Sequence, residues 1–164
     1  MDELLALLSK GKAGEVRRIA KERLAKDKGD AEAWFMLGMA AKHEGDSMRA
    51  MECYTRALYS KVSQKYLKAI AHLHMERFEF EAAANHLHRA LGLKKDADVN
   101  FMLGVCYLFL DSPKARLHIR EAWRIDPERT RKLLREFYND FFRDDEGIPE
   151  EEKKAILERL SRSD

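Results

Sequence analysis

Small residues recur at a nearly fixed spacing along the chain, a pattern typical of repeat proteins. One series is spaced by 33 and 33 residues and consists of Gly38, Ala71 and Gly104. A second series is spaced by 33 and 32 residues and consists of Ala57, Ala90 and Ala122. Each period also carries two apolar stripes at helical spacing, so the repeating unit is predicted to be a pair of helices joined by a turn.

The composition agrees with a helical chain and limits its partners. The 164 residues include only three prolines and eight glycines, which favours helices. Hydrophobic residues make up 45% of the chain, which excludes wholesale disorder. The 31 basic residues nearly balance the 29 acidic ones, and a net charge of +2 gives no global field that would attract nucleic acid or an anionic membrane.

At these repeating positions the chain resembles the tetratricopeptide repeat family. The unit of that family has about 34 residues, with Trp, Leu, Gly and Tyr on its first helix and Ala, an aromatic residue and Ala on its second. The first full repeat matches at Trp34, Leu37, Gly38, Ala50, Tyr54 and Ala57, and the last at Leu103, Gly104, Ala115, Ala122 and Pro127. Ala41 replaces the tyrosine of the first repeat. In the middle repeat, His74 stands at the tyrosine position and Phe78 where glycine is usual.

The resemblance implies an all-α fold, namely a right-handed α-solenoid of about three helix hairpins. Because one hairpin cannot bury its apolar face alone, the hairpins must stack and the ends of the stack must be covered. We therefore expect a shortened N-terminal helix hairpin at 1–30, three repeats at 31–63, 64–96 and 97–128, and C-terminal capping helices at 129–164.

The C-terminal cap is predicted from a helix start followed by an apolar stripe. Asp126 is a suitable N-cap, and Pro127 suits the first helical position. The stripe expected to cover the last repeat consists of Leu134, Phe137, Tyr138 and Phe141. A final helix is expected to begin near Ile148 and Pro149, with apolar residues Ile156, Leu157 and Leu160.

In the family, the first helix of each repeat lines a concave groove. The corresponding positions here are Phe35, Met39 and Lys42, then Lys68, His72 and Met75, then Phe101, Val105 and Leu108. Six of the nine are apolar, so the resemblance implies a non-catalytic protein–protein interaction module that binds a peptide or helix of a partner protein. Lys68 and His72 are expected to select an acidic group of that partner. Two alternatives stay open: self-association into a homo-oligomer, and occlusion of the groove by the chain's own C-terminal helix.

Two narrower roles within the family are less well matched. Some members bind acidic C-termini of heat-shock chaperones through a clamp of lysine, arginine and asparagine. Here the asparagine positions hold Met39 and Ala69, and the arginine position holds Met102, so we do not expect that role. The chain also resembles bacterial secretion chaperones in size, which makes a chaperone-like adaptor a further analogy.

The sequence contains no motif for catalysis or metal binding. No glycine-rich phosphate loop or Gly-x-Ser-x-Gly occurs, and Cys53 and Cys106 do not form a Cys-x-x-Cys. The six histidines include no His-x-x-x-His pair, so we expect no enzyme activity, metal or cofactor. Four of the six lie in the middle repeat, at positions 72, 74, 86 and 88, which leads to the hypothesis that its surface responds to pH near 6–7.

Charge is uneven along the chain. Residues 10–28 hold eight basic and three acidic residues, whereas 144–152 hold six acidic residues and no basic one. The basic segment leaves RNA binding as an alternative of low weight, and the opposite signs lead to a hypothesis of head-to-tail association. No stretch approaches about 18 consecutive apolar residues, and the N-terminus is not of the signal-peptide type, so a cytoplasmic location is expected.

Overall fold

The computed structural model describes residues 2–141, 149–151 and 154. Residues 2–141 form nine helices, and none of the described residues lies in a strand, which confirms the all-α fold class. The chain divides into two compact units, Met1–Leu93 and Lys94–Asp164. The apolar residues predicted for the final helix, Ile156, Leu157 and Leu160, lie outside the described residues.

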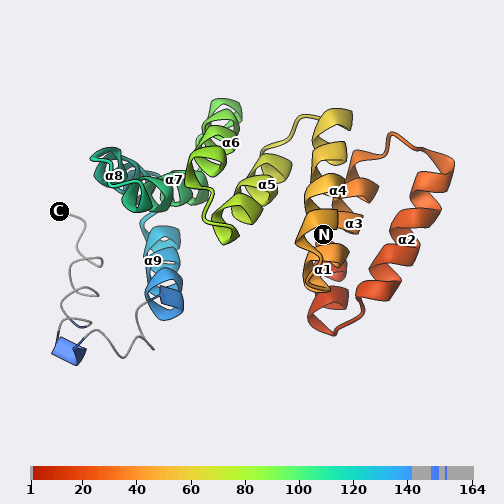
Figure 1. Ribbon diagram of the computed structural model, residues 1–164, viewed down its shortest axis with the longest axis horizontal. Helices are drawn as coiled ribbons and strands as arrows, with labels where there is room; N and C mark the ends of the chain where they lie inside the picture. Colours follow the sequence, from red (N-terminus) through yellow and green to blue (C-terminus); the bar gives the residue numbers. More distant parts are fainter. Residues whose placement is uncertain (1, 142–148, 152–153, 155–164) are drawn as a thin grey trace. The chain divides into compact units, whose positions relative to one another are not determined.

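The first unit consists of three consecutive helix pairs (Figure 1). Its helices are α1 (Asp2–Ser9), α2 (Ala13–Lys26), α3 (Ala31–His43), α4 (Ser47–Ser60), α5 (Gln64–Glu76) and α6 (Phe80–Leu93). The helices of each pair are joined by a short turn and pack on each other. In addition, α2 packs on α3 and α4 packs on α5, so that each pair is stacked on the next within this unit.

The second unit contains one helix pair and the helix that follows it. Its helices are α7 (Ala97–Phe109), α8 (Lys114–Ile125) and α9 (Pro127–Phe141). The predicted helix start is confirmed, because Asp126 accepts a hydrogen bond from the backbone amide of Arg129 at 2.9 Å and α9 begins at Pro127. Since α9 packs on both α7 and α8, it covers this pair within the unit.

The recurring glycines explain why the two helices of a pair approach closely. A Cβ atom added at Gly38 would lie 2.4 Å from the ring of Tyr54 on α4. A Cβ atom added at Gly104 would lie 2.5 Å from the side chain of Ile119 on α8. In both places the missing side chain is replaced by a bulky residue of the second helix, which is how a close-packed core fills its volume.

The turn inside each of the four helix pairs has the same backbone geometry. One residue per turn has a positive φ, and these are Gly11 (72°), Gly45 (82°), Phe78 (59°) and Asp111 (49°). In every turn the amide of the following residue donates to the carbonyl five residues earlier at 2.9 Å, which is the Schellman motif that ends a helix. Phe78 is the only bulky side chain among the four, and it is 73% exposed.

None of the helices in the described part of the chain is both long enough and apolar enough to span a lipid bilayer.

Candidate binding surface

The first helices of two successive pairs, α3 and α5, contact each other at both ends and in between. Near their N-terminal ends, Lys65 forms an ion pair with Glu32. In the next turn, the rings of Phe35 and Tyr66 lie with centroids 5.1 Å apart. Near the C-terminal ends, Lys42 of α3 reaches α5. The two helices therefore form a continuous face, and six of the nine predicted groove residues belong to them.

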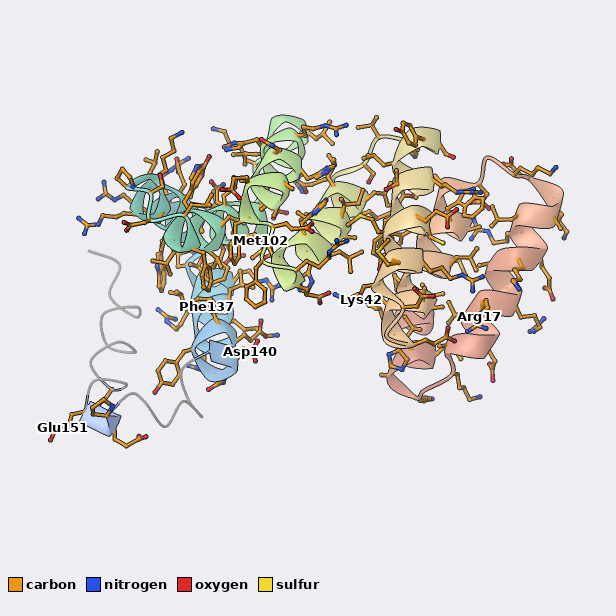
Figure 2. The ribbon with its side chains drawn as sticks, in the orientation of Figure 1. Arg17, Lys42, Met102, Phe137, Asp140 and Glu151 are labelled. Atoms are coloured by element: carbon orange, nitrogen blue, oxygen red, sulfur yellow. The ribbon has the colours of Figure 1, made fainter. Side chains whose placement is uncertain are left out.

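A polar cluster lies at the C-terminal end of this face and consists of Lys42, His72 and Glu76. The Lys42 Nζ atom, on the side chain labelled in Figure 2, is 2.8 Å from Glu76 Oε1 and donates to His72 Nδ1 at 2.9 Å. Glu76 Oε1 is also 3.1 Å from His72 Nδ1. The pKa of His72 is lowered, mainly because burial disfavours the charged imidazole and also because Lys42 repels it, while Glu76 acts in the opposite direction.

Phe35, one of the two apolar groove residues predicted on α3, packs in the core of the first unit. Phe35 is buried among α3, α4 and α5, where its ring packs on those of Tyr54 and Tyr66. Such a buried ring stabilises the unit and offers a partner little accessible area. Met39 is only partly buried, and on α5 the side chains of Lys68 and Met75 are partly buried as well. The accessible part of the face is therefore formed by the two methionines and the polar residues around them.

In the second unit, two of the three predicted groove residues are also buried. The Phe101 ring meets the Phe137 ring of α9 edge-on, with centroids 6.3 Å apart, and Figure 2 labels Phe137 on that helix. Val105 is buried too, whereas Leu108 is 56% exposed at the end of α7. Together with Leu134, Phe137 forms the buried part of the predicted capping stripe. The cap therefore covers Phe101, and Leu108 is the predicted residue that stays accessible.

Both cysteines of the chain are buried. Cys53 and Cys106 are free thiols in the core, and burial raises the pKa of both, that of Cys106 to about 12. A protonated, buried thiol is a poor nucleophile and a poor metal ligand. Across residues 2–141, 149–151 and 154, no three His, Cys, Asp or Glu side chains come together in a way that could hold a metal ion.

Internal ion pairs use half of the cations in the basic segment at 10–28. Lys12, Arg17, Arg18 and Arg23 pair with Glu15, Glu44, Glu22 and Asp30, respectively. The Arg23 guanidinium donates to both carboxylate oxygens of Asp30, at 2.8 and 3.0 Å, so this arginine is part of the α2–α3 connection. The segment consequently presents a weaker positive field than its sequence predicts, which lowers its suitability for RNA.

The sequence analysis missed Glu76, which completes the polar cluster. Glu76 follows His72 by four residues on α5, and residues at this spacing are neighbours on one helix face. That spacing was a usable signal for the His72–Glu76 pair. The approach of Lys42 was not predictable in the same way, because it depends on how α3 and α5 lie side by side.

With this geometry in view, comparison with known protein families identifies the repeat. Residues 31–61, which contain α3 and α4, match the model described as "Tetratricopeptide repeat". The chain carries a tetratricopeptide repeat. The resemblance predicted from the small and aromatic residues of this segment is thereby confirmed. No curated protein matches the sequence.

Solved structures of tetratricopeptide-repeat type share the fold along nearly the whole chain. A crystal structure of MamA matches with a TM-score of 0.70 and 21% identity, covering 99% of this chain and 95% of that one. MamA 41-end from Desulfovibrio magneticus RS-1 matches with a TM-score of 0.71 and 20% identity, covering 99% and 89%. YrrB, described as "a TPR protein with an unusual peptide-binding site", matches with a TM-score of 0.66 and 15% identity, covering 98% and 82%. At these identities the likeness concerns the fold alone.

Proposed function

We propose that this chain is a non-catalytic protein–protein interaction module, with repeats at 31–63, 64–96 and 97–128, that binds a peptide or helix of a partner protein. The binding surface is the face shared by α3 and α5. The observation that carries the proposal is that these two helices lie side by side while Met39, His72 and Met75 remain accessible to a partner. The peptide-binding site named in the description of YrrB supports this use of the fold.

The chemistry of the face favours a partner segment with both apolar and charged side chains. Methionine side chains adapt their shape to different apolar surfaces, so Met39 and Met75 suit a short apolar anchor. The Lys42–His72–Glu76 cluster offers a cation and a carboxylate, both partly exposed, beside them. Each anchor that becomes buried contributes about 1.5–3 kcal/mol before the entropy of binding is subtracted.

The proposal is tested by selecting peptides from a phage-displayed library on the wild-type chain and measuring their affinity by fluorescence anisotropy. Met39→Lys and Met75→Lys place a charge in the apolar part of the face and are expected to weaken binding at least about tenfold, which corresponds to one lost anchor. Met48→Lys is the matched control, because Met48 is 71% exposed on α4, a second helix. It should leave the affinity unchanged.

Two outcomes would contradict the binding face. One is equal affinity of the selected peptides for wild type, Met39→Lys and Met75→Lys, with unchanged melting temperatures. The other is a concentration-dependent dimer in sedimentation experiments that Met39→Lys converts to a monomer, because the face would then serve self-association. RNA binding is the outcome if the chain retains RNA and releases it steeply as salt rises.

A further inference from the structure

The α5–α6 pair holds two histidines in direct contact across the helix interface. The imidazole rings of His74 on α5 and His86 on α6 are stacked, with centroids 5.4 Å apart and an interplanar angle of 13°. The Nδ1 atom of His86 is buried, and no hydrogen-bond partner for it is found among the described residues. A neutral ring with its proton on Nε2 tolerates this position, because a lone pair without a donor costs less than a buried N–H without an acceptor.

His74 is tied to the turn between the two helices. Its Nδ1 atom lies 2.6 Å from Glu79 Oε2, and its carbonyl accepts the Glu79 amide at 2.9 Å in the Schellman motif. Glu79 also pairs with Arg77 at 3.0 Å. The hydrogen bond from His74 lowers the pKa of Glu79, as Arg77 does to a smaller extent. A proton added to His74 therefore finds a carboxylate beside it.

A proton added to His86 has no comparable partner. It would create a buried N–H donor without an acceptor, next to His74 and to Arg89 on the same helix. Burial lowers the pKa of His86 first, and the positive charges of His74 and Arg89 lower it further. On the other side of α5, helix α4 contributes Tyr54, whose pKa is raised mainly by burial and then by the charge of Glu76.

We propose that the α5–α6 pair is a proton-sensitive element, in which protonation of both stacked imidazoles weakens the packing of α5 on α6 and loosens the first unit in mildly acidic solution. Glu79 lies beside His74 as a counter-ion, whereas the buried Nδ1 atom of His86 has no hydrogen-bond partner among the described residues. The turn adds to this sensitivity, because Phe78 holds a left-handed backbone that costs a non-glycine residue free energy.

The direction of the pH effect follows from the lowered pKa of His86. The unfolded chain binds a proton at this residue near the ordinary value of 6.5, while the folded chain resists it. Stability from the neutral ring is therefore complete above pH 6.5 and decreases as the pH falls below it. His72 also has a lowered pKa and contributes in the same direction, so the test must separate the two residues.

The test compares urea unfolding of the full chain at about pH 7.5 and about pH 5.5, on either side of the ordinary histidine range. The urea concentration at the midpoint of unfolding is expected to fall when wild type is acidified. His86→Phe keeps a ring for stacking and removes the titrating nitrogen. Its urea midpoint should therefore fall distinctly less on acidification than that of wild type. His88→Phe, the same substitution two residues further along α6, controls for the exchange of a histidine for a phenylalanine on this helix. The contribution of His72 remains in all three proteins.

An equal fall of the urea midpoint on acidification in wild type and in His86→Phe would overturn the proposal. If His86→Phe does not fold, NMR titration of the ring carbon protons in wild type decides. We expect the titration midpoint of His86 to lie below 6.5, and a midpoint at or above that value would also overturn the proposal. Neither measurement involves partner capture, so both stand or fall independently of the proposed binding face.

Discussion

The α3–α4 and α5–α6 pairs of the first unit have the same turn geometry but carry different residues at the two positions where the backbone favours glycine. In α3–α4, glycine occupies both special positions: Gly38, where the second helix approaches, and Gly45, where φ is positive. In α5–α6 the corresponding residues are Ala71 and Phe78. It is the α3–α4 segment, at residues 31–61, that matches the family model.

The difference shows that the repeat tolerates residues that fit its backbone less well when side chains add contacts. The turn of α5–α6 has the same two types of hydrogen bond as that of α3–α4. It also has the His74–Glu79 pair, and the Phe78 ring meets the Phe80 ring edge-on at 6.2 Å. The less regular pair thus holds the stacked rings of His74 and His86 and the exposed ring of Phe78.

The largest expected effect comes from adding one methyl group to the regular pair. In Gly38→Ala the new Cβ atom would lie 2.4 Å from the ring of Tyr54, which is itself buried and cannot swing away. Overpacking of this kind costs about 1–3 kcal/mol, so the free energy of unfolding should fall by that amount. Chemical denaturation followed by circular dichroism measures it.

Gly92→Ala on α6 is the matched control for this substitution. No atom lies within 4 Å of a Cβ added at Gly92, so alanine should stabilise that helix by up to about 1 kcal/mol. Opposite signs for the two variants would show that Gly38 is required by the approach of α4. A neutral or stabilising Gly38→Ala would remove close approach as the reason for the recurring glycine.

An exchange of turn residues between the pairs is expected to have the next largest effect. Gly45→Phe places a bulky residue at φ 82° and should destabilise the chain by about 1–2 kcal/mol, although no atom lies within 4 Å of a Cβ added there. Phe78→Gly should stabilise it by up to about 1 kcal/mol, since the relief of the backbone is offset by the lost contact with Phe80. Thermal melting of both variants measures the exchange.

Destabilisation by Phe78→Gly would mean that the exposed ring contributes more through its contacts than the left-handed backbone costs. Phenylalanine would then be the more stabilising residue at position 78, in spite of the positive φ.

The positions of the helices were predictable from local pattern, because glycines, prolines, caps and apolar spacing all act within a few residues. Burial of the predicted anchors was not predictable in this way. Phe35 is covered by Tyr66 of the next first helix, 31 residues later, and Phe101 by Phe137 of the cap, 36 residues later. Whether an apolar residue beside the main stripe meets solvent or a neighbour depends on the stacking of pairs, which no single repeat encodes.

The same limit applies to the polar residues of the face. Lys42 and His72 were both predicted to line the groove, and His72, together with Lys68, was predicted to select an acidic group of the partner. Their contact depends on the parallel placement of α3 and α5, which brings together residues 30 positions apart. A polar residue chosen from sequence for a ligand can thus be partly satisfied by its own chain.

The smallest expected effect concerns this contact, through which Lys42 of the regular pair adds to the lowering of the His72 pKa by burial. Lys42→Met removes a cation that lowers the pKa of His72, so that pKa should rise. Glu76→Gln removes a carboxylate that raises it, so the pKa should fall. NMR titration of the His72 ring measures both shifts.

The stability of these two variants should follow the same order. In Lys42→Met the pKa of His72 in the folded chain should lie closer to the ordinary value of 6.5, which applies in the unfolded chain. This variant should therefore lose less stability than wild type between neutral and mildly acidic pH. Glu76→Gln should lose more. Because the cluster is partly exposed and screened by solvent, its effect on stability at neutral pH should stay within about 1 kcal/mol. Shifts of the same sign in both variants would show that burial alone controls His72 and that the two pairs are not coupled through charge.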